Sequence, residues 1–452
     1  MKKILPLAIP LILSQLIQQL MLFTDIWMFS RIGINEMAAG GLGAQVFSII
    51  FIIAASIIGC SANLISISYG KLALDRKKAE KEISMHLKGS ILLSLIFTFI
   101  LMVIFIYIPN LMIQFGQKRD VVILANEYLS ALKWSIFPSL IFFVFRALSG
   151  SYGKVKSIMI LSLVTVMLNI PLTYFFAFYL NMGISGVGWG TTIANFSGMI
   201  GYGFWLFRQN EFTIFSLLKN LDEYKLSSLK PILCIGLPIA IATVLEYGLI
   251  ASGTFFVGVL GVAALATQQI LLQCLNFSYN VSYGLAQASS IISGRNYGQN
   301  NINEISNVTK KTILMVTISS GLFALFFNLN PNLLLDIFDI SSTIRTQDFL
   351  DSFQIILVVM GLTLVADAWQ ISIISILRSM KIVKIPTFIT MIGYWLIGIP
   401  FSYALMTFFG VVGVWSGICL GLMVTSILLY LNYHKSTINL KLYHKQETEA
   451  LV

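Results

Sequence analysis

The chain has 452 residues, of which 57% are hydrophobic and only 11% are charged. A soluble domain carries about 25% charged residues, so this composition excludes an ordinary soluble protein and indicates an integral membrane protein. The formal net charge of +10 does not indicate a nucleic-acid-binding protein, because the basic residues are spread over many loops without a compact aromatic-basic patch.

Apolar runs long enough to cross about 30 Å of hydrocarbon predict an all-α membrane protein with twelve transmembrane helices. The expected ranges are 4–30, 42–68, 90–113, 124–148, 157–180, 184–207, 231–258, 263–293, 311–330, 350–377, 386–409 and 411–433. The first run is too long for a signal peptide, so we expect it to be retained as a helix. The sequence between these runs is too short for a folded soluble domain.

Most of the 29 Lys and Arg residues fall on one side of the predicted helices. That side comprises the N-terminus, 70–89, the turn at Lys154 and Lys156, 208–230, 294–311, 378–384 and the tail. Lys and Arg beside membrane helices stay preferentially in the cytoplasm. We therefore expect a multi-pass protein with both termini in the cytoplasm.

The second half of the chain repeats the first at an offset of about 228 residues. The string NIPLTY at 169–174 returns as GIPFSY at 398–403, and GISGVGWG at 183–190 returns as GVVGVWSG at 410–417. Each copy contains six predicted crossings, an even number, so both copies enter the membrane from the same side. The repeat predicts two parallel six-helix bundles related by an axis along the membrane normal.

The polar stretch at 208–230 separates the two copies. It predicts an N-terminal lobe at 1–207, a cytoplasmic linker at 208–230, a C-terminal lobe at 231–434 and a cytoplasmic tail at 435–452. Pro10 and Pro238 are a matched pair across the repeat, and we take them as hinge candidates, although a static kink is an equally open interpretation.

Three acidic residues lie within predicted membrane helices: Asp25, Glu246 and Asp367. Each costs about 2.5 kcal/mol or more at mid-membrane unless it faces a polar cavity. At the 228-residue offset their counterparts are Gly253, Gln18 and Ser139. Because the repeat mates lack the carboxylates, we predict that the three acids serve function, with hydrogen bonding between helices as the structural alternative.

A carboxylate in a membrane cavity can bind Na⁺ together with neutral oxygens, or can take up a proton. Either event removes its negative charge and couples an ion to a competing cationic cargo. The three histidines, His86, His434 and His444, lie in predicted inner loops or the tail. A histidine proton relay is therefore not expected, and coupling rests on the carboxylates, with Na⁺ and H⁺ both open.

Other polar residues within the predicted helices could complete such sites. Two pairs lie one helical turn apart and so share a face. The candidates are Asn169 with Thr173, Thr191 with Asn195, Gln269, and Tyr247. Ordinary hydrogen bonds between packed helices are the alternative for each residue.

Enzyme signatures are missing from the sequence. There is no P-loop for ATP, no HExxH motif and no paired-cysteine ligand set. The four cysteines lie singly in apolar helices and are predicted to be packing residues. We expect no enzymatic activity and no cofactor beyond a coupling ion.

Five segments together resemble the multidrug and toxic compound extrusion (MATE) transporters, in particular their bacterial NorM-like branch. They are FTDIWMFSRIG (23–33), LNIPLTYFF (168–176), GLPIAIATVLEYG (236–248), VADAWQ (365–370) and YWLIGIPFSY (394–403). The resemblance covers essentially the whole chain. It implies a V-shaped pair of lobes that work by alternating access.

The resemblance also implies an activity: export of cationic or amphipathic drugs and toxic compounds, driven by a Na⁺ or H⁺ gradient, by a monomer in the bacterial inner membrane. By position, Asp25 and Asn169 match a polar site of the N-terminal lobe. Glu246 and Asp367 match the acidic pair that binds the coupling cation in the NorM-like branch, and they are the stronger candidates for Na⁺. Thr173 stands where relatives often have Asn or Asp, which removes a stronger ligand from the N-terminal site.

The main alternative is a lipid-linked oligosaccharide flippase of the same superfamily. Such proteins tend to hold a pyrophosphate with cationic residues. The predicted cavity here carries acids instead, with Lys133 and Arg146 as the only basic candidates. The sequence therefore favours drug export.

Overall fold

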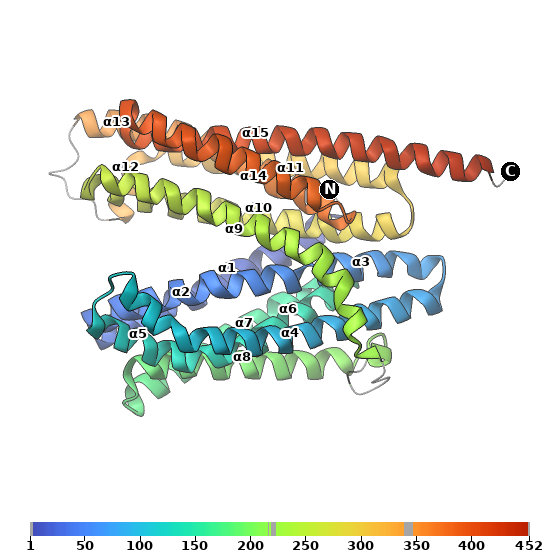
Figure 1. Cartoon of the computed structure of the whole chain (residues 1–452), viewed down its shortest axis with the longest axis horizontal. Coiled ribbons are helices and arrows are strands. Elements are labelled where there is room, and N and C mark those ends of the chain that lie inside the picture. The colour runs from blue at the N-terminus through green and yellow to red at the C-terminus, as the bar shows by residue number, and fades with distance from the viewer. Residues whose placement is uncertain (1–2, 216, 218–222, 339–346, 451–452) are drawn as a thin grey trace. The chain divides into compact units, whose positions relative to one another are not determined.

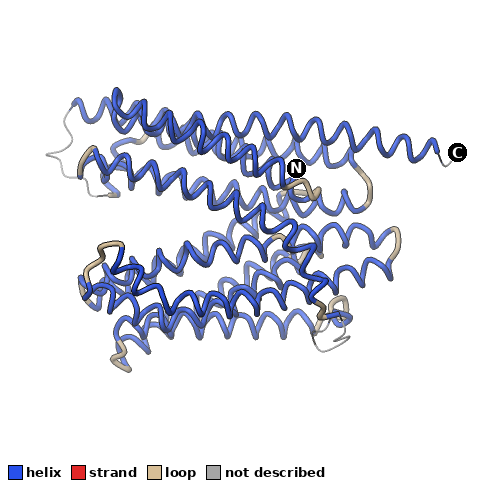
Figure 2. Tube along the Cα trace, viewed as in Figure 1, coloured by secondary structure: helices blue, strands red, loops and turns tan. Residues whose placement is uncertain are grey.

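The fold is given by a computed structural model, which describes residues 3–215, 217, 223–338 and 347–450. Every regular element within these ranges is a helix, and they contain no β-strand (Figure 2). The predicted all-α class is confirmed.

The first half of the chain forms six helical rods, as predicted. The helices are α1 (Leu5–Ile32), α2 (Ile34–Gly59), α3 (Ser61–Gly70), α4 (Arg76–Gln114), α5 (Arg119–Leu132), α6 (Ile136–Ser151), α7 (Val155–Tyr174) and α8 (Gly183–Phe207). α2 and α3 make one rod, and a 3₁₀ turn at Lys133–Ser135 joins α5 to α6. α7 ends in a π-helical turn, Phe175–Tyr179.

The second half repeats this plan. Its helices are α9 (Leu229–Val259), α10 (Val262–Gly298), α11 (Ile302–Leu329), the short α12 (Pro331–Ile337), α13 (Gln347–Ser379), α14 (Lys384–Met391) and α15 (Ile399–Ala450). A π-helical segment, η7 (Ile392–Gly398), joins α14 to α15. α10, α11, α13 and α15 lie side by side (Figure 1).

Gly410 divides α15 into the eleventh and twelfth predicted crossings. Its φ of 56° lies in the left-handed region that glycine tolerates best. The last helix is predicted to end at residue 433, yet α15 continues to Ala450. Tyr433 and Leu440 pack against the apolar cluster around Ile305. This packing stabilises the helical conformation of the polar tail.

Nine helical segments of the described chain are long and apolar enough to cross a membrane. One of them, Lys384–Leu442, contains two of the twelve predicted crossings. α8 and α10 are not among the nine. In α10 the glutamines Gln268, Gln269 and Gln273 lower the mean hydropathy of the helix. α10 is therefore more polar than the helices beside it.

The chain divides into two compact units. We call Leu13–Ala240 the N-terminal unit, and Met1–Ile12 together with Ile241–Val452 the C-terminal unit. The divisions fall inside α1 and α9, after residues 12 and 240, which are again 228 residues apart. The first turns of α1 therefore group with the C-terminal unit, and the first part of α9 groups with the N-terminal unit.

The predicted boundaries 1–207 and 231–434 stay a prediction about the repeat, and the division inside α1 and α9 differs from them. Residues 216 and 218–222 of the predicted linker, and 451–452 of the predicted tail, lie outside the described residues. Pro10 and Pro238 each stand two residues before a division. Their role as hinges remains a prediction.

A buried ion pair fixes the end of the linker to α4 within the N-terminal unit. Lys88 Nζ lies 2.8 Å from Glu223 Oε2, and the Lys88 side chain is 0% exposed. The hydroxyl of Ser84 donates to the same carboxylate oxygen. The Lys88 Nζ also lies 5.7 Å from the centre of the Tyr224 ring. The start of α9 is thus held by α4 rather than by a free loop.

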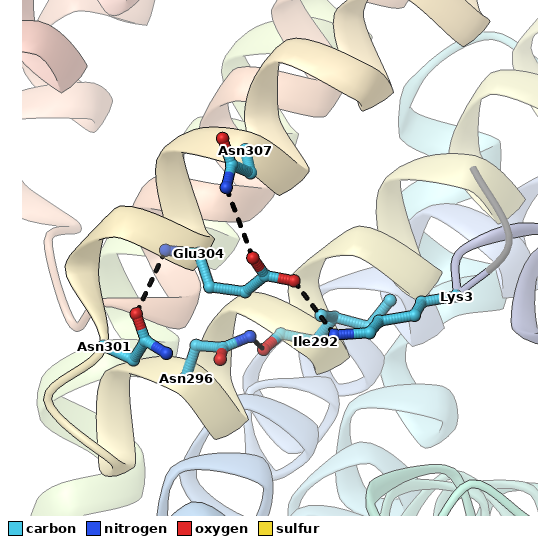
Figure 3. A network of polar contacts seen from close by, with 6 residues as sticks. All are labelled: Lys3, Ile292, Asn296, Asn301, Glu304 and Asn307. Carbon is cyan, nitrogen blue, oxygen red and sulfur yellow. Dashed lines mark hydrogen bonds and ion pairs between the residues drawn. The ribbon is translucent and has the colours of Figure 1, made fainter.

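An exposed ion pair holds the start of α1 within the C-terminal unit (Figure 3). Lys3 Nζ donates to Glu304 Oε1 at 3.1 Å, and the two side chains are 78% and 26% exposed. Glu304 also accepts from Asn307, and its backbone N–H donates to the side chain of Asn301, which caps α11. Each of the two helices that cross between units therefore begins at an ion pair.

A close helix crossing is common to both units. A Cβ on Gly190 of α8 would stand 2.5 Å from Thr173 Oγ1, and a Cβ on Gly417 of α15 would stand 2.5 Å from Ser402 Oγ. Only glycine allows these backbones to approach so closely. The repeated sequence therefore builds the same helix–helix contact twice.

Candidate functional site

Four predicted residues of the N-terminal unit form one buried hydrogen-bond chain. Thr191 of α8 donates its hydroxyl to Asp25 Oδ2 of α1 at 3.0 Å. Asn169 of α7 donates its amide to Thr191 Oγ1 at 2.9 Å and to Thr173 Oγ1 at 3.2 Å. All four side chains are buried. α1, α7 and α8 thus bring together residues that are up to 166 positions apart.

Two oxygens of this hydrogen-bonded group have no partner among the described residues. Asp25 Oδ1 and Asn169 Oδ1 are both buried, and no group in the described structure donates a hydrogen bond to either. A buried acceptor without a donor costs about 1–3 kcal/mol. Both atoms are acceptors, so a cation or a proton is the kind of partner that would satisfy them.

The Asp25 chain lies in the wall of a cavity of about 260 Å³ within the N-terminal unit. Asp25, Thr191 and the predicted Asn195 all line it. Its apolar wall includes the aromatic residues Phe47, Phe51, Tyr128, Phe142 and Phe143. Neither Lys nor Arg is among the lining residues. The cavity therefore offers aromatic surface and one carboxylate.

Sequence reasoning missed most of this wall, including Gln18 and Ser139. Both had entered the sequence analysis only as the repeat mates of Glu246 and Asp367. That correspondence was the available signal, because equivalent positions of a repeat occupy equivalent places in the two bundles. The two C-terminal acids therefore stand at positions that line a cavity in the other copy.

The acidic pair of the C-terminal unit joins α9 to α13. Glu246 is half-buried and Asp367 is 6% exposed, and the two carboxylates interact electrostatically. Arg378, further along α13, interacts with Glu246. The net charge of these three groups is −1 when both acids are ionised, which suits one monovalent cation.

Several tyrosines lie near this pair. Tyr279, Tyr283 and Tyr394 each interact with the charges of Glu246 or Arg378, and the rings of Tyr279 and Tyr283 stack at 5.7 Å. These tyrosines and Arg378 were not among the predicted site residues. Tyrosine is common in apolar helices, so its presence alone gave no signal.

Of the two other predicted residues, Tyr247 joins the tyrosines that interact with Glu246, and Gln269 points elsewhere. Gln269 is exposed, whereas its neighbour Gln268 is fully buried, accepts from Trp415 Nε1 at 2.7 Å and donates to Thr254 Oγ1 at 3.2 Å. Tyr247 is 55% exposed. Gln268 therefore links α10 to α9 and α15 by hydrogen bonds. Gln269 belongs neither to the Asp25 group nor to the acidic pair.

Known proteins match nearly the whole length of the chain. The MatE family model matches residues 10–175 and 238–404, which are the two copies of the repeat. The chain belongs to the MatE family. The two matches begin at Pro10 and Pro238, so the family unit and the internal repeat coincide.

Two curated proteins resemble this chain over nearly its full length. A protein of Pseudomonas putida named "Probable multidrug resistance protein NorM" is 29% identical over 441 residues, covering 95% of this chain and 93% of its own length. A protein of Rhizobium meliloti with the same name is 29% identical over 435 residues, covering 94% and 91%. The resemblance to the NorM-like branch is thereby confirmed.

Solved MatE-family structures share the fold. An outward-facing multidrug resistance MATE family transporter matches with a TM-score of 0.86 at 21% identity, covering 97% of this chain and 96% of that one. A eukaryotic MATE transporter matches with a TM-score of 0.84 at 16% identity, covering 97% of each chain. The membrane fold of two six-helix repeats is therefore that of this family.

Proposed function

We propose that the protein is a cation-coupled antiporter that exports cationic or amphipathic compounds by alternating access. The observation that carries this proposal is the N-terminal cavity, in which one buried carboxylate, Asp25, faces aromatic and apolar side chains. Aromatic faces and a carboxylate attract organic cations together. The name of the curated relatives, "Probable multidrug resistance protein NorM", supports drug export.

Coupling would use the carboxylates of both units. A Na⁺ ion or proton that neutralises Asp25, or the pair Glu246 and Asp367, removes the charge that holds a cationic cargo. One Na⁺ entering along a potential of about 100 mV releases roughly 2.3 kcal/mol, which supports a gradient of a neutral cargo of several tens-fold. Export of a neutral cargo against a gradient is thus possible without ATP, whereas a monovalent cationic cargo exchanged for one Na⁺ gains nothing from the potential and depends on the Na⁺ concentration gradient.

The flippase alternative fits the cavity less well. A pyrophosphate needs cationic groups around it, and the lining residues include Asp25 but neither Lys133 nor Arg146. We further propose that the protein works as a monomer in the bacterial inner membrane, with both termini in the cytoplasm. The cation excess of the inner loops supports this orientation.

Transport in proteoliposomes tests the proposal. Asp25→Asn, Glu246→Gln and Asp367→Asn should each reduce gradient-driven efflux of a fluorescent organic cation about tenfold, because each removes a charge for which ion and cargo compete. Asp351→Asn is the matched control, since Asp351 is an exposed acid at the start of α13. Wild-type efflux in all three site variants would refute the coupling assignment.

A further inference from the structure

A second hollow of the N-terminal unit lies where α1 and α7 end. It has a volume of about 570 Å³, and Trp27 and Met28 of α1 line it together with Pro171 and Tyr174 of α7. The lining continues to Tyr179 in the π-helical turn that follows α7. None of the lining residues is charged. We call this hollow the α1–α7 groove, and its surface suits a hydrocarbon chain.

The α1–α7 groove lies on the reverse side of the two helices that carry Asp25 and Asn169. Trp27 follows Asp25 by two positions, and Pro171 follows Asn169 by two positions, which turns each by about 200° around its helix. Asp25 and Asn169 are buried, whereas Trp27 and Tyr174 are 45% and 57% exposed. The groove and the cavity beside Asp25 share no lining residue. They are therefore two separate sites.

The ends of α1 place the groove near the membrane surface. Lys3 stands just before the first turn of α1, and Arg31 stands in its last turn. The 28 residues of this helix make it about 42 Å long, whereas the hydrocarbon core is about 30 Å thick. Arg31 therefore lies at the depth of the lipid headgroups. Trp27, Tyr174 and Tyr179 belong to the aromatic belt that is typical of this depth.

Arg31 gives the groove a positive charge at its edge. Its guanidinium carbon lies 5.2 Å from the centre of the Trp27 ring, and its side chain is exposed. Within the described residues Arg31 takes part in no ion pair. A guanidinium binds phosphate oxygens through paired hydrogen bonds. The same charge disfavours a cationic cargo, so the groove suits an anionic amphiphile.

We infer that the α1–α7 groove binds an acyl chain of an anionic phospholipid whose phosphate is held by Arg31. Inside a bilayer, an apolar groove has no hydrophobic advantage over the surrounding lipid chains. The selectivity for this lipid therefore comes from the charge of Arg31, and the groove supplies the place for the chain. The bound lipid contacts α1 and α7, the helices that position Asp25 and Asn169, from the side opposite to the cavity.

Native mass spectrometry of the purified protein tests the inference, with phosphatidylglycerol and phosphatidylcholine of equal chain length as probes. The wild-type protein should retain its tightest-bound phosphatidylglycerol about tenfold more strongly than phosphatidylcholine, because the choline cation is repelled by Arg31. Arg31→Gln should abolish this preference. Ile170 lines the groove and is 40% exposed, so Ile170→Trp should fill the groove and weaken retention of both lipids.

Two matched control variants should retain both lipids as the wild type does. Arg208→Gln removes an exposed arginine whose guanidinium carbon lies 4.4 Å from the Phe204 ring, at the end of α8. Ile160→Trp enlarges a residue of α7 that is 54% exposed and does not line the groove.

Two kinds of result would overturn the inference. The first is an unchanged lipid preference in Arg31→Gln, or wild-type retention of phosphatidylglycerol in Ile170→Trp. The second is displacement of the retained lipid by a fluorescent organic cation, which would make the groove a cargo site instead.

Discussion

In the N-terminal unit, Thr191 donates to Asp25 at 3.0 Å. The matching residues of the C-terminal unit, within one residue of the 228-residue offset, are Ile418 and Gly253, and a Cβ on Gly253 would stand 2.8 Å from Ile418 Cδ1. One copy therefore keeps a polar contact where the other closes it with a methyl group. The fold tolerates either chemistry at this position.

The relation is reversed at a second pair of positions. Glu246 and Asp367 are acids in the C-terminal unit, and their mates Gln18 and Ser139 are neutral residues lining the N-terminal cavity. Each unit thus carries its carboxylates where the other has none. The two copies share the scaffold and differ in the positions of their ionisable groups.

The largest effect is expected when an acid is placed at Gly253, the position in the C-terminal unit that matches Asp25. Gly253→Asp puts a carboxylate against Ile418 without a donor, and we expect it to lower the free energy of unfolding by about 2.5 to 3.5 kcal/mol. Chemical denaturation in detergent measures the change. Gly253→Ala is the control, because it meets the same methyl group without a charge. Equal stability of the two variants would show that this place in the C-terminal unit can accept a polar site.

Removing the donor in the N-terminal unit should have a smaller effect. Thr191→Val loses the hydrogen bond to Asp25 and the acceptor for Asn169, and we expect a loss of about 1.5 kcal/mol together with altered ion dependence of efflux. The neighbouring Thr192 bonds only to the carbonyl of Ala131 at 2.9 Å. Thr192→Val should therefore lower stability and leave the ion dependence unchanged. The same ion dependence in both variants would contradict a site role for Thr191.

The smallest effect is expected at the ion pair that starts α1. Lys3→Ala should lower stability by about 0.5 kcal/mol or less, because Lys3 is 78% exposed and the pair with Glu304 is screened by salt. Thermal unfolding at low and high salt measures it. The corresponding pair at the start of α9 has a fully buried lysine, Lys88. If Lys3→Ala and Glu223→Gln lower the free energy of unfolding by the same amount, the expectation that the buried pair contributes more than the exposed pair is wrong.

Much of the helical plan could be predicted because membrane helices follow from runs of apolar residues. The twelve predicted ranges correspond to the observed rods, and the repeat coincides with the two family matches. The extension of α15 to Ala450 could not be predicted, since a polar tail stays helical only through its contacts at Tyr433 and Leu440. The division inside α1 and α9 could not be predicted either. The sequence of a continuous apolar helix does not indicate which unit each part of the helix packs against.

By itself, the sequence determined the helices, the duplication and the three membrane acids, since each depends on local composition or on matching positions. Only the tertiary structure decided which polar residues meet. It linked Asp25 to Asn169 through Thr191, and it buried Gln268 while exposing Gln269. Hydrogen bonds between helices depend on the rotation and approach of whole rods, which close glycine contacts such as Gly190 with Thr173 set.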